Sequence, residues 1–74
     1  MTLNEFIGLL AEQFDSTSAA EITPTTKFKE LSDWSSLTAL SVIAMVDEEC
    51  GKSINSDIIK NSQTIEELYN HIFR

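Results

Sequence analysis

Few residues in this chain are of types that could support chemistry. Two adjacent serines, Ser35 and Ser36, stand in the stretch DWSSLTAL, directly before a run rich in apolar residues. There is one cysteine, Cys50, and one histidine, His71. A serine at the start of a helix often caps it, but an exposed one can also be modified. A cysteine and a histidine can form a nucleophile–base pair. The sequence therefore raises three hypotheses: a helix cap, a modified serine and a Cys50 hydrolase.

The hydrolase hypothesis is the weakest, because Cys50 lies on the apolar side of its predicted helix, as a small core residue does. It would need Cys50 to be exposed and reactive. His71 is expected at the rim of the last helix. The acidic stretch DEECGKSINSDI resembles a calcium loop only superficially, since Lys52 replaces the required Gly and Ile58 the required Glu. Zinc-ligand spacings and a Gly-rich phosphate loop are missing. We therefore expect neither a bound metal nor a self-contained enzyme.

Length and charge narrow the class of protein further. A chain of 74 residues is expected to form one domain, residues 1–74, with a thin core, because small domains bury only about 60% of their unfolded surface. Twelve acids against five bases give a net charge of −7. This argues against nucleic acid and favours partners with basic surfaces. We expect no membrane span, no secretion signal and, with a single cysteine, a cytoplasmic setting.

Four segments show helical patterns, and none shows the alternation of a strand. The predicted helices are residues 2–14, 36–50, 64–73 and, at most as a short helix, 55–60. Gly51 is a stop signal directly after the second of them. These elements predict an all-α fold, a small four-helix bundle with a long first loop and a short third helix.

Two of the predicted helices begin with a capping-box pattern. Thr2 precedes Glu5 by three residues, and Thr64 precedes Glu67 by the same spacing. Between the first two helices lies a segment of about 20 residues without a helical pattern. It carries four large apolar residues, Ile22, Phe28, Leu31 and Trp34. We therefore expect this segment to pack across the bundle.

The second helix is apolar around most of its circumference. At 100° per residue, a broad arc comprises Ala39, Leu40, Val42, Ile43, Ala44, Val46 and Cys50. The remaining strip comprises Thr38, Ser41, Glu48 and Glu49, with Met45 inside it and Leu37 at its edge. We expect the arc to be buried and the strip to be exposed. Carboxylates beside apolar side chains are typical of a docking surface, although a solvated face with one stray methionine remains the alternative.

Taken in order, several motifs are similar to those of acyl carrier proteins, over nearly the whole chain. They are EITPTTKF with Phe28 eight residues before Ser36, the pair Ser36–Leu37, Leu40, the acids Asp47–Glu49, Gly51, Ile54 and the helix after Thr64. The resemblance implies a 4'-phosphopantetheine arm, transferred from coenzyme A to Ser36 by a separate phosphopantetheinyl transferase. Its thiol would carry acyl groups as thioesters between enzymes of fatty-acid or related acyl synthesis. A phosphodiester at Ser36 would also lie at the positive end of the helix dipole.

The resemblance also implies where partner enzymes bind. Acyl-transferring or synthase enzymes with basic surfaces are expected to contact Leu37, Met45, Glu48 and Glu49, with Asp47 in support. The family usually has Asp where this chain has Ser35, and acids at Thr38 and Ser41, so we expect docking through fewer charges. The protein is expected to be a monomer.

Other readings of the resemblance stay open. The apolar arc, with Phe6, Leu10, Phe28 and Ile65, is a candidate enclosure for part of an acyl chain. The cargo could instead be an aminoacyl or polyketide-type group of a secondary pathway. A carrier-like fold that is never modified could act as an interaction module. Finally, Ser35 could be the acceptor, with Ser36 its neighbour.

Overall fold

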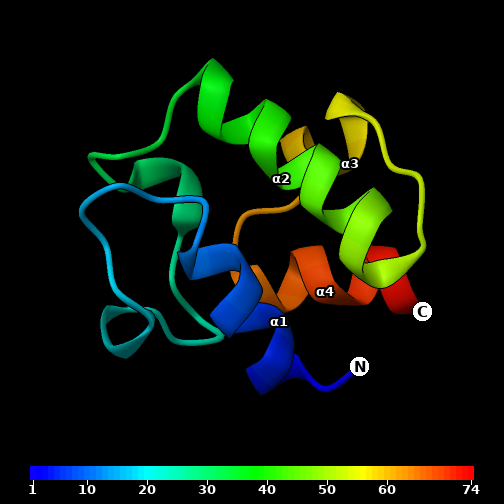
Figure 1. The fold of residues 1–74 in the computed structure, drawn as a ribbon, viewed down its shortest axis with the longest axis horizontal. Coiled ribbons are helices and arrows are strands. Elements are labelled where there is room, and N and C mark those ends of the chain that lie inside the picture. Colours follow the sequence, from blue (N-terminus) through cyan, green and yellow to red (C-terminus); the bar gives the residue numbers. More distant parts are fainter.

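The computed structural model describes residues 1–74, and its regular elements are all helices. The helices are α1 (Leu3–Ala11), α2 (Ser36–Cys50), α3 (Ser56–Lys60) and α4 (Ile65–Phe73), with 3-10 turns η1 (Ala19–Glu21) and η2 (Phe28–Glu30). α1 packs on α2 and α4, and α3 packs on the same two helices, which closes a four-helix bundle (Figure 1). The predicted fold class is thereby confirmed.

Three predicted helices have nearly the observed bounds, but the first is shorter than its pattern. α1 ends at Ala11, whereas the apolar spacing continues to Phe14. The amides of Gln13 and Phe14 instead donate to the carbonyls of Leu10 and Ala11, three residues back, and form a tight turn. Phe14 is still buried in the core, which explains why its spacing matched the helix.

The two capping boxes have different outcomes. At α1 both bonds are present: the amide of Glu5 donates to Thr2 Oγ1 over 3.2 Å, and the amide of Thr2 to Glu5 Oε1 over 2.8 Å. At α4 the hydroxyl of Thr64 accepts from the amide of Glu67, but the Glu67 carboxylate accepts from the amide of Gln63. The second capping box is therefore only half correct: the Glu67 carboxylate was expected to accept from the amide of Thr64, but it accepts from the amide of the preceding residue, Gln63.

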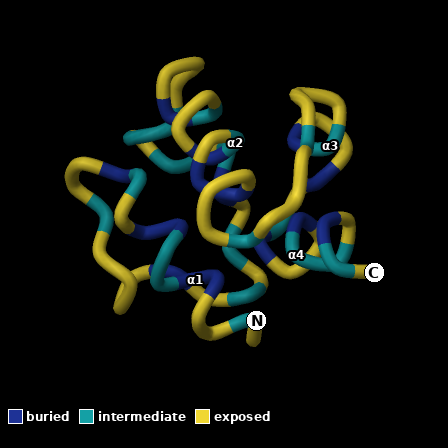
Figure 2. The backbone as a smooth tube through the Cα atoms, turned by 45° about the vertical axis from the view of Figure 1, so that its right-hand side comes forward, coloured by how far each residue is buried: buried dark blue, intermediate teal, exposed yellow.

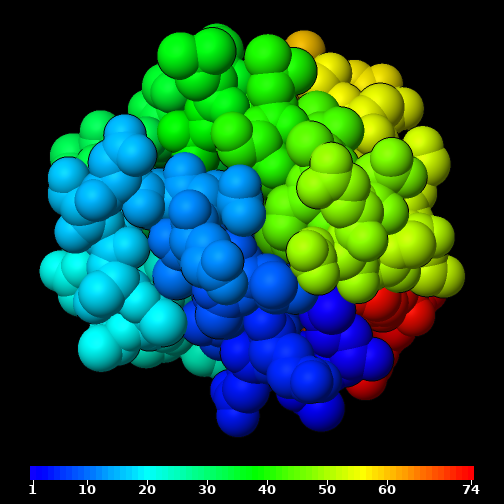
Figure 3. Space-filling model, viewed as in Figure 1, coloured from blue at the N-terminus to red at the C-terminus, as the bar shows by residue number.

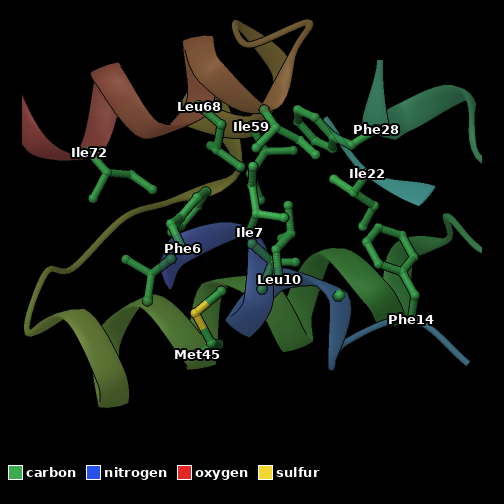
Figure 4. Packing of buried hydrophobic residues seen from close by; sticks show 14 residues of the cluster. Phe6, Ile7, Leu10, Phe14, Ile22, Phe28, Met45, Ile59, Leu68 and Ile72 are labelled. Atoms are coloured by element: carbon green, nitrogen blue, oxygen red, sulfur yellow. The ribbon is translucent and has the colours of Figure 1, made fainter. Parts of the chain in front are cut away.

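The core gathers side chains from all four helices and from the long segment between α1 and α2 (Figures 2 and 4). Its largest fully buried members are Phe6, Leu10, Phe28, Ile65 and Leu68. Ile22 and Phe28 come from the long segment, and Leu31 and Trp34 pack partly buried against the cluster. The expectation that this segment packs across the bundle is confirmed.

The long segment also completes the start of α4. The amide of Ile65 donates to the carbonyl of Thr26 over 3.2 Å, and the amide of Glu66 to the carbonyl of Pro24 over 2.9 Å. The first amides of a helix have no partner within the helix. Residues distant in sequence supply these acceptors and thereby attach the segment to the bundle.

The faces of α2 differ from their prediction. Thr38, Val42, Met45 and Val46 are buried, at spacings of three, four and seven residues, whereas Leu40 is 62% exposed. The predicted strip wrongly included Met45, which is 4% exposed and points into the core (Figure 4). A helix that is apolar nearly all round has little preference for one inward face. The direction is set by its packing on α1 and α3.

The two glycines lead to a paired stability prediction. Gly51 ends α2 in the left-handed conformation at φ 66°, and Gly8 lies inside α1. A methyl group at either position would meet no atom within 4 Å, so only the backbone decides the effect. Gly51→Ala should lower the free energy of unfolding by about 1 kcal/mol, and Gly8→Ala should raise it by roughly 0.4–1 kcal/mol. Urea denaturation measures both, and shifts of the same sign would contradict this account.

Candidate functional site

The structure gives the two serines at the start of α2 different surroundings. Ser35 is the N-cap, with extended backbone, and its Oγ accepts from the amide of Thr38 over 3.3 Å. The Thr38 hydroxyl donates to the carbonyl of Asp33 over 2.9 Å, so across the 3.2 Å between the two hydroxyl oxygens Ser35 is the donor. Ser36 is the first residue of the helix; it is exposed and its hydroxyl makes no hydrogen bond. Only Ser36 therefore offers a free hydroxyl.

The segment before the serines is fixed by Asp33. Its Oδ2 accepts from the amide of Ser16 and from the hydroxyl of Thr17, each over 2.8 Å. These bonds, that from Thr17 first, hold the pKa of the Asp33 carboxyl below its usual range. Asp33 thus joins the beginning of the long segment to the start of α2. Its carboxylate binds Ser16 and Thr17 of the segment, and its backbone carbonyl accepts from the hydroxyl of Thr38 in α2.

Trp34 fixes the same segment through apolar contacts. Its ring meets that of Phe28 edge-on, with 5.2 Å between the ring centres, and lies 6.3 Å from that of Phe14. Phe28 is fully buried, so the indole is anchored to the core. The start of α2 is consequently held on both sides, by hydrogen bonds and by aromatic packing.

A groove of about 600 Å³ adjoins Ser36. Its apolar walls come from Trp34, Ala39, Leu40, Ile43 and Ile59. On α2 the lining positions recur at three- and four-residue spacing from Ser36 to Ile43, so the groove follows one face of the helix for about 10 Å. Its volume lies in the range of small-molecule sites.

These surroundings fit a phosphate ester on Ser36. The first turn of α2 contains no acidic residue, and a helix N-terminus attracts negative charge through its dipole and its free amides. The exposed hydroxyl leaves room for attachment, and the adjoining groove is large enough for part of an arm or its cargo.

The acids at the other end of α2 are exposed, as expected. Glu48 and Glu49 line a hollow of about 210 Å³ between α1 and α2, to which α1 contributes Leu9 and the next residue after the helix, Glu12, adds a third carboxylate. These two helices lie side by side on the face seen in Figure 3. Met45 lines the hollow but is almost wholly buried, so little of it is available to a partner.

The remaining candidates do not form a nucleophilic site. Burial first, and then the charge of Glu49, raise the pKa of the Cys50 thiol, which keeps it protonated at neutral pH. Its sulfur lies 3.6 Å from that of Met1. His71 Nδ1 is 2.7 Å from the hydroxyl of Ser62, which also donates to the carbonyl of Ile58, so Nδ1–H is the donor of the first bond. Both residues have structural contacts.

No three His, Cys, Asp or Glu side chains gather in a way that could hold a metal ion. None of the helices combines the length and the apolar character needed to cross a membrane.

Comparison with known proteins decides the family. The family model described as "Phosphopantetheine attachment site" matches residues 3–72. The chain belongs to the phosphopantetheine attachment-site family. Proteins of this family carry a covalently attached 4'-phosphopantetheine, so the resemblance to acyl carriers is confirmed. Neither the comparison with curated proteins nor that with solved structures gave a significant match.

Several residues around the serines of this phosphopantetheine carrier were missed by the sequence analysis. Asp33 was not singled out, although an aspartate shortly before a helix is a common source of loop hydrogen bonds. Lys29 and Lys60 line the groove, yet they are 31 residues apart and carry no shared motif. Thr38 was expected to be exposed and is buried; its hydroxyl is satisfied there by the carbonyl of Asp33.

The lowered pKa of Asp33 gives a pH-dependent prediction. A carboxyl whose pKa is depressed by folding stabilises the protein above its unfolded pKa of about 3.9 and loses this contribution as the pH falls through the folded value. Asp33→Asn should therefore lower the urea midpoint at pH 7, with the difference from wild type vanishing well below pH 3.9. Asp15→Asn removes the same charge at an exposed residue whose side chain makes no hydrogen bond, and should not lower the midpoint. If Asp33→Asn lowered the urea midpoint as much well below pH 3.9 as at pH 7, the role of the Asp33 charge would be contradicted.

Proposed function

We propose that this protein is an acyl carrier whose 4'-phosphopantetheine arm is attached to Ser36. The observation that carries the proposal is the difference between the two serines. Ser35 uses its hydroxyl as the cap of α2, whereas the hydroxyl of Ser36 is exposed and free at the edge of an apolar groove. When bound, the arm supplies a thiol that holds acyl groups as thioesters. The chain itself presents the cargo and is not an enzyme.

The partners are proposed from the same helix. A phosphopantetheinyl transferase must reach Ser36, and acyl-transferring or synthase enzymes of fatty-acid or related acyl synthesis must reach the arm. Leu37, which is 76% exposed, offers an apolar contact beside the arm, and the exposed acids Asp47, Glu48 and Glu49 offer charge to a basic surface. Met45, which was predicted to contact partner enzymes, is not among the proposed contacts because it is buried. The lone cysteine supports placing this work in the cytoplasm.

The attachment site is tested by intact mass. Coexpression with a broad-specificity phosphopantetheinyl transferase should add the mass of one phosphopantetheine to the wild type and to Ser35→Ala. Ser36→Ala should remain unmodified with unchanged helicity. Ser35→Ala should lose about 0.5–2 kcal/mol of stability, as a weakened N-cap does. Modification that persists in Ser36→Ala would transfer the site to another residue, and an unmodified wild type would favour the interaction-module alternative.

The docking surface is tested by charge reversal. Glu48→Lys should slow association with the transferase about 1.4- to 5-fold at low salt, corresponding to roughly 0.2–1 kcal/mol for an exposed pair. The effect should shrink as salt screens the charges. Glu66→Lys makes the same charge change at an exposed residue of α4 and serves as the control. Equal effects in both variants would mean that net charge, not this surface, steers the partner.

A further inference from the structure

The groove beside Ser36 has a charge pattern unlike that of the rest of the protein. None of the twelve acidic residues of the chain lines it, whereas two of its five basic residues do. These are Lys29 of η2 and Lys60 at the end of α3. In a protein of net charge −7, this groove therefore combines apolar walls with positive charge alone.

The ammonium group of Lys29 is held in place. It donates to the backbone carbonyl of Lys60 over 2.9 Å and lies 6.0 Å from the centre of the Phe28 ring. An ammonium group has three protons to donate, so two remain for a ligand. Lys60 brings the second charge from an exposed position in the last turn of α3. Both lysines line the same groove as Ser36 and the apolar residues of α2, but they come from other elements, η2 and α3.

We propose, resting on the carrier function above, that the groove favours tethered acyl groups whose free end bears a carboxylate. The apolar residues contact the methylene chain, and the lysines bind the terminal anion. An uncharged alkyl chain would gain from the apolar walls but nothing from two ammonium groups. The phosphodiester of the arm is another anion, but it is joined to Ser36 at the start of α2, where the free amides of the helix already favour it. The cargo carboxylate is therefore the anion assigned to the lysines.

The test compares three forms of the protein, loaded enzymatically from coenzyme A, from hexanoyl-coenzyme A and from adipoyl-coenzyme A. Intact mass first verifies that each group is attached once. The chemical shift of the Trp34 indole N–H, at the only tryptophan of the chain, then reports whether cargo occupies the groove. We expect a larger shift for the adipoyl form than for the hexanoyl form, and a loss of this difference at high salt.

Charge-removing variants assign the effect to the lysines. Lys60→Gln removes the charge of Lys60 but leaves the backbone carbonyl that holds Lys29 in place, and Lys29→Gln removes the charge of Lys29 itself. Each should lower the ratio of bound to free adipoyl cargo about 1.4- to 5-fold, the range of one exposed ion pair. Lys52→Gln removes the same charge at an exposed residue outside the groove and should have no effect. In the hexanoyl form, none of these three substitutions should change the ratio of bound to free cargo.

The outcomes separate the two proposals. Equal shifts for the hexanoyl and adipoyl forms, or equal effects of Lys60→Gln and Lys52→Gln, would overturn the inference while leaving the carrier function intact. Effects of the lysine variants that are already complete with the unacylated arm would reassign the lysines to the phosphodiester and also overturn it. A wild type that gains no mass would overturn the carrier function, and this inference with it.

Discussion

The first amides of each helix must find acceptors that the helix cannot supply, and this constraint organises the whole molecule. Thr2 and Asn55 meet it locally for α1 and α3. At α4 it is met by Thr64 and by carbonyls of the long segment, so the start of that helix and the path of the segment depend on each other. At α2 it is met by Ser35. The position of the long segment follows from these bonds together with the burial of Phe28.

The capping of α2 has a direct functional consequence. Because Ser35 uses its hydroxyl as the cap, the following residue, Ser36, enters the first turn with its own hydroxyl unbonded. Asp33 and Trp34 hold the backbone just before them, one through hydrogen bonds to the long segment and one through aromatic packing. The backbone that carries the exposed Ser36 hydroxyl is therefore held rigidly, as the proposed attachment of a flexible arm at this residue would require.

Charge is divided between two regions of the surface around α2. The acids Asp47, Glu48 and Glu49 lie at its C-terminal end, where a basic partner can be steered by them. The first turn carries no acid, and the groove beside it is lined by two lysines, Lys29 and Lys60, and by no acid. The positively charged groove beside Ser36 is thus kept apart from the acids at the other end of α2, so these acids do not repel an anion held at the proposed attachment site.

Much of the fold was predictable from the sequence alone, because the information is local. Capping residues, apolar spacing and the stop at Gly51 act within a few residues, and they defined the starts of the helices, the full extent of α2 and the all-α class. The serine pair, the apolar residues of the long segment and the order of the carrier motifs likewise needed no structure. Through the resemblance to acyl carriers, these motifs also identified Ser36, next to Leu37, as the candidate site.

Only the tertiary structure decided which face of α2 turns inward, because a helix that is apolar nearly all round can pack in several orientations. Packing on α1 and α3 buries Met45 and Thr38 and leaves Leu40 exposed. The sequence could not predict three further features. These are the capping of α4 by the carbonyls of Pro24 and Thr26, the hydrogen bonds of Asp33, and the groove between α2, η2 and α3. Each joins residues far apart in the chain, and no spacing along the sequence specifies contacts that arise only when separate segments settle against a shared core.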